Sequence, residues 1–187
     1  MKKTFALILT LALILSLAAC ANNTGGTGGG GNPPTNTAGN SAKGSNGAGN
    51  QSAALTPSIT PADGFVKNES ATKLTYNKQN GTDFASITVT IYPNLNETAN
   101  DYATKSKKNM QGTTSDITNV KINGFDAAEF TNTSTSGGQK TRFDFIAKDG
   151  AIYSIGCMVI SAGGDGAKLY DDNAAAFQSM LDSFTLK

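Results

Sequence analysis

Residues 151–160, AIYSIGCMVI, form the stretch that most constrains the fold. Successive residues of a strand point to opposite faces of a sheet, and here both sets are apolar: Tyr153, Ile155, Cys157 and Val159 on one face, Ile152, Met158 and Ile160 on the other. Because such a strand must bury both sides, we expect it at the centre of a sheet with a covering layer on each face. Cys157 is then a small buried hydrophobe.

Three turn signals predict that this strand ends an antiparallel meander. Asn123-Gly124 separates residues 116–122 from 125–133, and both residue types tolerate the positive φ of a type I′ turn. A five-residue STSGG connection leads to residues 139–148, and Asp149-Gly150 leads from there to residues 151–160. Upstream, residues 73–77 and 84–93 are also predicted strands, the second with β-branched alternation.

Two segments have helical spacing. In residues 94–112 the packing stripe is Leu95, Ala99, Tyr102, Ala103, Ser106 and Met110, and Asn94 or Asn96 is the expected N-cap. Near the C-terminus the stripe is Leu169, Asn173, Ala176, Phe177, Met180 and Leu181, with Asp165, Asp171 and Asp172 as expected caps. The tail 183–187 is expected to form an edge strand or a cap. The order of two strands, helix, four strands and helix predicts an α+β domain over residues 56–187.

The first nineteen residues have the features of a secretory signal peptide. Lys2 and Lys3 precede an uncharged apolar run, Phe5–Leu17, that is shorter than the roughly 20 residues of a membrane span. Leu17-Ala18-Ala19-Cys20 resembles a bacterial lipobox. The resemblance implies that the Cys20 thiol receives diacylglycerol and that the chain is cut just before it. Palmitate-type acyl chains would then anchor the protein to the outer face of the bacterial cell membrane.

Residues 20–55 are predicted to be a flexible linker, because Gly, Asn, Ser, Thr and Ala dominate and Lys43 is the single charged residue. From residue 56 onward, twelve basic and fourteen acidic residues give a net charge of −2. The charges are mixed and form no basic stripe, so we expect no nucleic-acid partner. With Cys20 lipidated, Cys157 has no partner for an intrachain disulfide.

Several segments of the predicted domain resemble the PsbP-like α/β/α sandwich. They are FASITVTIYP (84–93), NGFDAAEF (123–130), KDGAIYSI (148–155), AAFQSML (175–181) and DSFTL (182–186). The superfamily includes extrinsic photosystem II subunits, a Ran-binding nuclear-import factor and many bacterial lipoproteins. The resemblance implies an antiparallel sheet between helices, and a protein that binds other proteins rather than an enzyme. No functional residue carries over one by one.

The chain has no histidine, which removes several classes of enzyme. Ser–His and Cys–His nucleophile pairs need an imidazole, and zinc sites use Cys and His together. Carboxylate pairs remain, either Asp126 with Glu129 or Asp144 with Glu129 across a hairpin. The aspartates after residue 164 lack the spacing of an EF-hand. We therefore expect no catalysis, no cofactor and no metal, with a carboxylate-based hydrolase as the least favoured alternative.

Arg142 and Asp144 lie on one face of a predicted strand. With a two-residue turn at Asp149-Gly150, Arg142 faces Cys157 and Asp144 faces Ile155. The pair would then stand beside an apolar surface that includes Tyr153. One interpretation is an exposed ion pair on the rim of the sheet. The other is a binding groove lined by Arg142, Asp144 and Tyr153.

Together these observations predict a lipid-anchored, non-enzymatic accessory or protein-binding module outside the bacterial membrane. Its partners would be the membrane, through the lipid, and a protein that the sequence does not identify. A lipoprotein that binds a small ligand is the main alternative.

Overall fold

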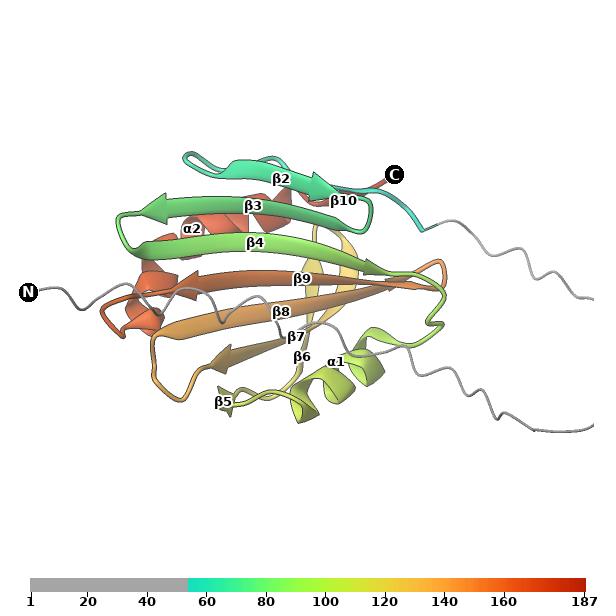
Figure 1. The fold of residues 1–187 in the computed structure, drawn as a ribbon. Coiled ribbons are helices and arrows are strands. Elements are labelled where there is room, and N and C mark those ends of the chain that lie inside the picture. Colours follow the sequence, from blue (N-terminus) through green and yellow to red (C-terminus); the bar gives the residue numbers. More distant parts are fainter. Residues whose placement is uncertain (1–53) are drawn as a thin grey trace, which may run out of the picture. The chain divides into compact units, whose positions relative to one another are not determined.

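A computed structural model describes residues 54–187 (Figure 1). The predicted signal peptide (1–19), Cys20 and all but the last two residues of the predicted linker (20–55) lie outside the described residues. The fold below is therefore that of the domain predicted for residues 56–187, together with Ala54 and Leu55.

An eight-stranded sheet forms the centre of this domain, with the order β2-β3-β4-β9-β8-β7-β5, and β6 also pairs with β7. All of its pairings are antiparallel. Its strands are β2 (Val66–Ser70), β3 (Lys73–Asn80), β4 (Asp83–Tyr92), β5 (Thr113–Thr114), β6 (Thr118–Ile122), β7 (Phe125–Thr133), β8 (Gln139–Lys148) and β9 (Ala151–Ile160).

The central place of β9 is confirmed, because it pairs with β4 on one side and β8 on the other. The β4–β9 pairing runs from Phe84↔Ile160 to Tyr92↔Ile152. It joins the N-terminal hairpins to the C-terminal meander in one sheet, which local sequence patterns did not predict.

The predicted hairpins of the meander are confirmed. Asn123 and Gly124 have φ values of 42° and 89°, and Asp149 and Gly150 have 50° and 77°. Two consecutive residues with positive φ are the signature of a type I′ turn, whose twist matches that of the strands it joins. β8 and β9 occupy the predicted residues 139–148 and 151–160.

β1 (Pro57–Ser58), β2 and β5 were not predicted. β2 has the sequence VKNES, which lacks the alternation of apolar residues that identifies a half-buried strand. It forms by pairing with β3, from Val66↔Asn77 to Ser70↔Lys73. At the other end of the chain the predicted edge strand is confirmed as β10 (Thr185–Leu186), which pairs with β1 in a separate two-stranded sheet.

The first helix, α1 (Ala99–Lys108), begins later and ends earlier than predicted. Asn94 and Asn96 have positive φ values of 61° and 49°, so they belong to the turn before the helix and neither is its N-cap. The cap is Thr98, whose Oγ1 accepts a hydrogen bond from the Asp101 N–H at 3.1 Å. A side-chain oxygen in this position satisfies one of the free N–H groups of the first turn.

The second helix, α2 (Gly166–Asp182), has Asp165 as its N-cap. Asp165 Oδ1 accepts from the Lys168 N–H at 2.9 Å. Asp171 and Asp172 lie within the helix and are exposed, so the expectation that they cap it is wrong.

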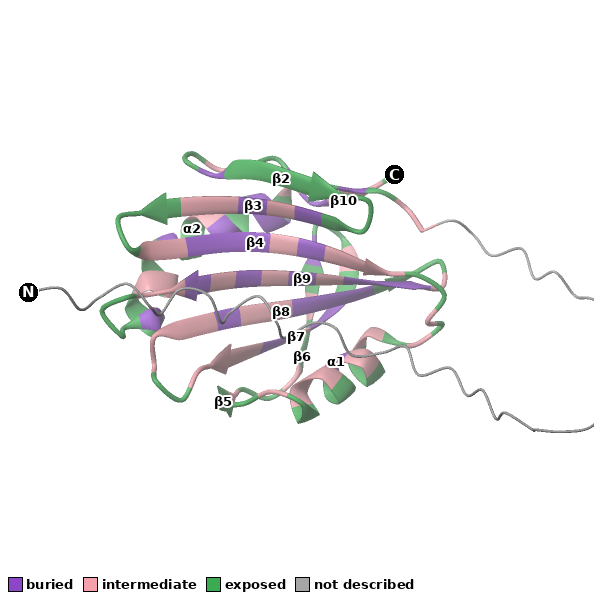
Figure 2. Cartoon of the chain, in the orientation of Figure 1, coloured by how far each residue is buried: buried purple, intermediate pink, exposed green. Residues whose placement is uncertain are grey.

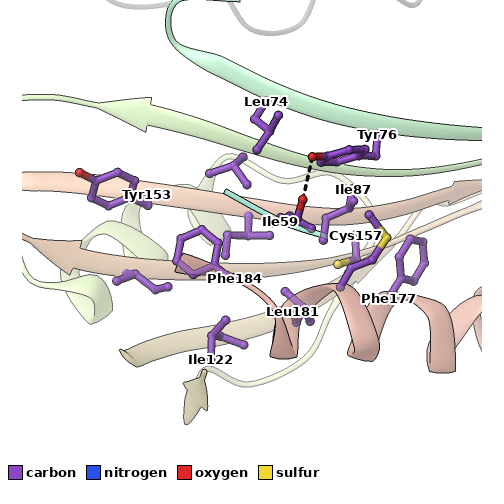
Figure 3. Packing of buried hydrophobic residues seen from close by; sticks show 14 of the residues in the cluster. Ile59, Leu74, Tyr76, Ile87, Ile122, Tyr153, Cys157, Phe177, Leu181 and Phe184 are labelled. Atoms are coloured by element: carbon purple, nitrogen blue, oxygen red, sulfur yellow. Dashed lines mark hydrogen bonds between the residues drawn. The ribbon is translucent and has the colours of Figure 1, made fainter. Parts of the chain in front are cut away.

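The helices lie on opposite faces of the sheet, and a separate apolar cluster forms under each (Figures 1 and 2). The larger cluster packs beneath α2 and contains Ile87, Ile155, Cys157, Phe177 and Leu181 (Figure 3). The smaller cluster lies beneath α1 and consists of Ala103, Ala128, Phe130, Phe145 and Ile152. The predicted α+β class, an antiparallel sheet between helices, is confirmed.

Candidate functional site

The predicted pair on β8 forms a close, two-pronged ion pair. Arg142 Nε donates to Asp144 Oδ2 at 2.9 Å, and Arg142 Nη2 donates to Asp144 Oδ1 at 3.0 Å. The register expected across the Asp149-Gly150 turn is confirmed, because Arg142 faces Cys157 and Asp144 faces Ile155. The pair therefore points toward the α2 side of the sheet.

Glu129 is the third member of this charged cluster. It lies on β7 directly opposite Asp144, and its Oε2 is 2.9 Å from Arg142 Nη2. The predicted approach of Glu129 and Asp144 across a hairpin is thus confirmed, with Arg142 binding both carboxylates. Asp126, the other partner considered for Glu129, instead pairs with Lys121 at 2.7 Å on the surface.

The cluster is buried unevenly. The Asp144 side chain is 0% exposed, against 18% for Arg142 and 23% for Glu129. The interpretation of Arg142 and Asp144 as an exposed ion pair on the rim of the sheet is therefore wrong. Above the cluster, Lys140 pairs with Asp171 of α2 at 3.5 Å and lies over the ring of Tyr170, 4.7 Å from its centroid. These contacts join the helix to β8.

Burial and ion pairing oppose each other at Asp144 and at Arg142, and burial prevails at Asp144 alone. It raises the pKa of Asp144 from 3.8 to about 6, although Arg142 by itself would lower it. Burial would lower the pKa of Arg142, but its contacts with Asp144 and Glu129 together raise it. The Arg142 guanidinium thus pairs with two carboxylates, and the fully ionised cluster carries a net charge of −1.

Tyr153 does not form a shared open wall with this pair. It is fully buried, and its neighbours in the sheet are Ile91 and Ile146. It belongs to the larger apolar cluster, and Figure 3 shows it at the end of that cluster away from α2. Two shallow hollows on the described surface are lined by other residues. The groove of Arg142, Asp144 and Tyr153 stays a prediction, and of its three side chains Arg142 alone reaches the surface.

Cys157 is a free, fully buried thiol, as expected. Burial raises its pKa, which disfavours the nucleophilic thiolate. This residue therefore contributes packing rather than chemistry.

The surface that sequence reasoning missed is the part of the sheet that α1 leaves uncovered. α1 packs over Ile152 of β9, but Met158 and Ile160 further along the same strand face remain half-buried. Among residues 54–187 no element lies over that part of the face (Figure 1). The covering layer expected on this face of β9 is therefore present but partial, because α1 covers Ile152 and leaves Met158 and Ile160 half-buried. We call this surface the open face.

The open face is lined mainly by small polar side chains and has a shallow hollow of about 350 Å³. The hydroxyls of Thr75 and Thr88 lie 3.2 Å apart across β3 and β4. The residues around the hollow come from β2, β3, β4 and β9: Asn68, Glu69, Ser70, Lys73, Thr75, Asn77, Phe84, Ser86, Thr88 and Met158. Alternating threonines in the sequence indicated a strand, but they did not indicate that α1 leaves this part of the face uncovered.

The aspartates considered for calcium are used in other ways. Asp165 caps α2, Asp171 pairs with Lys140, and Asp172 pairs with Lys168 at 2.6 Å. Within residues 54–187, no three Cys, His, Asp or Glu side chains are grouped so that they could hold a metal ion. No helix in that range is both long and apolar enough to span a membrane.

No protein-family model and no curated protein sequence matches the chain. Several solved structures have a similar fold. A protein from Bacteroides thetaiotaomicron VPI-5482 is 10% identical with a TM-score of 0.46, and the match covers 70% of this chain but only 45% of that one. LpqN, described as involved in cell envelope biogenesis of Mycobacterium tuberculosis, is 16% identical with a TM-score of 0.49, over 71% of this chain and 85% of that one.

A PsbP protein is also among these structures. The cyanobacterial PsbP (CyanoP) of Synechocystis sp. PCC 6803 is 10% identical with a TM-score of 0.41, over 75% of this chain and 96% of that one. At these identities and TM-scores the likeness carries no conclusion about function.

Proposed function

We propose that this chain is a lipid-anchored accessory protein that binds a partner protein outside the bacterial membrane and catalyses no reaction. The anchoring half of the proposal is supported by the lipobox-like Leu17–Cys20 at the end of an apolar run. The linker that follows would let the domain search for partners near the surface, since a flexible tether raises their effective concentration.

The observation that carries the binding half is the open face. A sheet is a rigid platform, and most sheets in proteins of this class cover their apolar strands with a second layer. Here the face keeps the partly exposed Phe84 and Met158 beside the hydroxyls of Thr75 and Thr88. Mixed apolar and polar contacts of this kind are typical of protein surfaces that bind a partner reversibly.

The arrangement of the carboxylates supports a binding protein over a hydrolase. A general acid or base must reach the proton that it transfers. Asp144 is enclosed, and both it and Glu129 are bound by Arg142. Such a cluster is suited to holding β7 against β8.

Metabolic labelling with a palmitate analogue tests the anchor. We expect the full chain to be labelled, and Cys20→Ser to lose the label and leave the membrane fraction. Cys157→Ser is the matched control, because it removes the other cysteine of the chain and should keep the label. A full chain without label, or a label that survives Cys20→Ser, would refute the anchor.

Site-specific photo-crosslinking tests the binding surface. A photoreactive residue at Thr88, on the open face, should capture a protein in intact cells. The same residue at Thr104, exposed on α1, is the control and should capture none. Equal capture at both positions, or none at Thr88, would overturn the assignment of the open face.

A small-ligand binder is the second candidate. The hollow of about 350 Å³ lies near the lower end of the range for small-molecule sites, roughly 300–1,000 Å³. Capture of a small metabolite rather than a protein at Thr88 would favour this alternative.

The predicted groove at Arg142 has its own test. If it binds a partner, Arg142→Ala should weaken capture of that partner in a domain that remains folded. If Arg142→Ala lowers the melting temperature and leaves capture intact, the residue is structural and the groove is refuted.

A further inference from the structure

β2 is the edge strand of the large sheet, and no strand among the described residues pairs with its outer side. All five of its residues are exposed (Figure 2). Val66 exposes 71% of its surface and is the one strongly exposed large apolar residue within residues 54–187. An edge strand presents unpaired N–H and C=O groups to which another strand can bond.

The hairpin turns determine which backbone groups of β2 are free. Ser70 and Lys73 flank a two-residue turn, and residues in that position form a hydrogen-bonded pair. Because bonded and non-bonded pairs alternate along an antiparallel ladder, Asn68 also bonds to β3. Lys67 and Glu69 therefore direct their N–H and C=O groups outward. The two-residue turn that follows β3 gives the same alternation.

The side chains of these two outward-bonding residues carry opposite charges. Lys67 Nζ lies 2.6 Å from Glu69 Oε2, and each side chain is about half exposed, 51% and 48%. If two copies of β2 pair antiparallel about Asn68, Lys67 of each copy faces Glu69 of the other. Opposite charges in facing positions of a sheet stabilise the pairing, whereas like charges destabilise it.

The order of charges also selects one register. Pairing centred on Lys67 would place two lysines opposite each other, and pairing centred on Glu69 would place two glutamates opposite each other. We propose that two copies of this chain associate edge to edge through β2, antiparallel and centred on Asn68.

This pairing has a structural consequence for the open face. Asn68 and Ser70 line the hollow on that face, so the hollow reaches the edge of the sheet. Two copies joined at β2 would present two hollows side by side on one continuous sheet. The association would thus create a bivalent surface.

Charged residues on an edge strand also serve to prevent pairing, and this is the competing role for Lys67 and Glu69. Cysteine crosslinking separates the two roles. In the proposed register residue 68 of each copy forms a non-hydrogen-bonded pair, with Cα atoms about 4.5 Å apart, which is within reach of a disulfide. In the same register, residue 66 of one copy lies about 13 Å along the strand from residue 66 of the other.

The experiment uses intact cells that produce the full chain and mild oxidation with copper phenanthroline. We expect Asn68→Cys to give at least about tenfold more disulfide-linked dimer than Val66→Cys, because the two cysteines meet in the first variant alone. The wild-type chain measures any dimer that arises from Cys20 or Cys157. An Asn68→Cys yield no higher than that of Val66→Cys overturns the proposal.

Charge changes in the Asn68→Cys background test the register. Lys67→Glu places two pairs of glutamates in facing positions and should lower the dimer yield about tenfold. Adding Glu69→Lys to that variant restores opposite charges and should restore the yield. Equal yields from all three variants, or no recovery in the charge-swapped one, refute a pairing centred on Asn68. Because these residues are exposed, each variant should keep the melting temperature of the wild type, and this is measured as a check of folding.

Discussion

Asp144→Asn is the substitution that most directly tests the electrostatics of the buried cluster. Two effects oppose each other at this carboxyl: burial favours its neutral form, and Arg142, 2.9 Å away, favours its charged form. In the structure burial prevails and raises the pKa of Asp144 to about 6. Asparagine has the same shape and does not titrate, so it removes this one source of pH dependence.

The size of the expected change in unfolding free energy follows from the pKa shift of Asp144. A rise from 3.8 to about 6 is about two pKa units, and each unit is worth about 1.4 kcal/mol, which gives about 3 kcal/mol. The folded state holds its proton more tightly than the unfolded chain between these two values. Stability contributed by Asp144 is therefore fully present below pH 3.8 and is lost as the pH rises through about 6.

Urea unfolding of both proteins at intervals from pH 4 to pH 8 provides the assay. The difference in unfolding free energy, wild type minus Asp144→Asn, should fall by about 2.5 kcal/mol over this range, because pH 4 already lies just above the ordinary pKa of 3.8. Other titrating groups contribute to both proteins and cancel in the difference. Asp126→Asn is the matched control for the loss of one carboxylate, because that side chain is 89% exposed.

A difference that rises with pH would refute this account. It would mean that Arg142 outweighs burial and that the pKa of Asp144 lies below its ordinary value. A flat difference would equally contradict it, since it would mean that Asp144 has the same proton affinity in the folded and unfolded states.

Two further predictions concern packing. In a Cys20→Ser background, Cys157 should react with a thiol reagent about a thousandfold more slowly in the folded protein than in urea. The reason is that the buried thiol reacts only when the domain opens. Rapid labelling of the folded protein would contradict the burial of Cys157. Gly166→Ala should lower the unfolding free energy by about 1–3 kcal/mol, because a Cβ there would lie 2.9 Å from the backbone of Gln139, and denaturant titration measures this. Gly163→Ala is its control, with its nearest neighbouring atom 3.7 Å away, and should change stability by less than about 0.5 kcal/mol; equal effects of the two substitutions would contradict the close packing at Gly166.

Much of the meander could be predicted because its signals are local. The Asp149-Gly150 turn supplies the positive φ that its hairpin requires, and the apolar pattern of β9 reports its burial directly. The packing stripes of both helices were also readable, since most of their members lie in the two apolar clusters. These features depend on residues that are neighbours in the chain.

The parts that were not predicted depend on distant contacts. β2 has no apolar pattern of its own and is a strand because β3 lies beside it. The start of α1 was wrong because asparagine serves both as an N-cap and as a residue with positive φ, and Asn94 and Asn96 take the second role. Thr98, only two residues on, is the actual cap.

The candidate site shows the same division. The facing of Arg142 and Cys157 followed from one turn and was predicted. The approach of Glu129 was considered, but its contact with Arg142 was not, because it depends on the conformation of two long side chains. The burial of Tyr153 and the open face both depend on where the helices pack, which no local pattern specifies.

The pairing of β1 with β10 brings the two ends of the described chain together. Thr56 N–H donates to the Lys187 carbonyl at 2.7 Å, and Lys187 N–H donates to the Thr56 carbonyl at 3.0 Å. A force applied between the residues that precede Ala54 and a point in the large sheet would therefore break the hydrogen bonds between β1 and β10 before it acts on the large sheet. A fluorescent protein fused after Lys187 would likewise emerge next to Thr56, where the chain enters the domain, and near Glu69 and Ser70 at the end of β2.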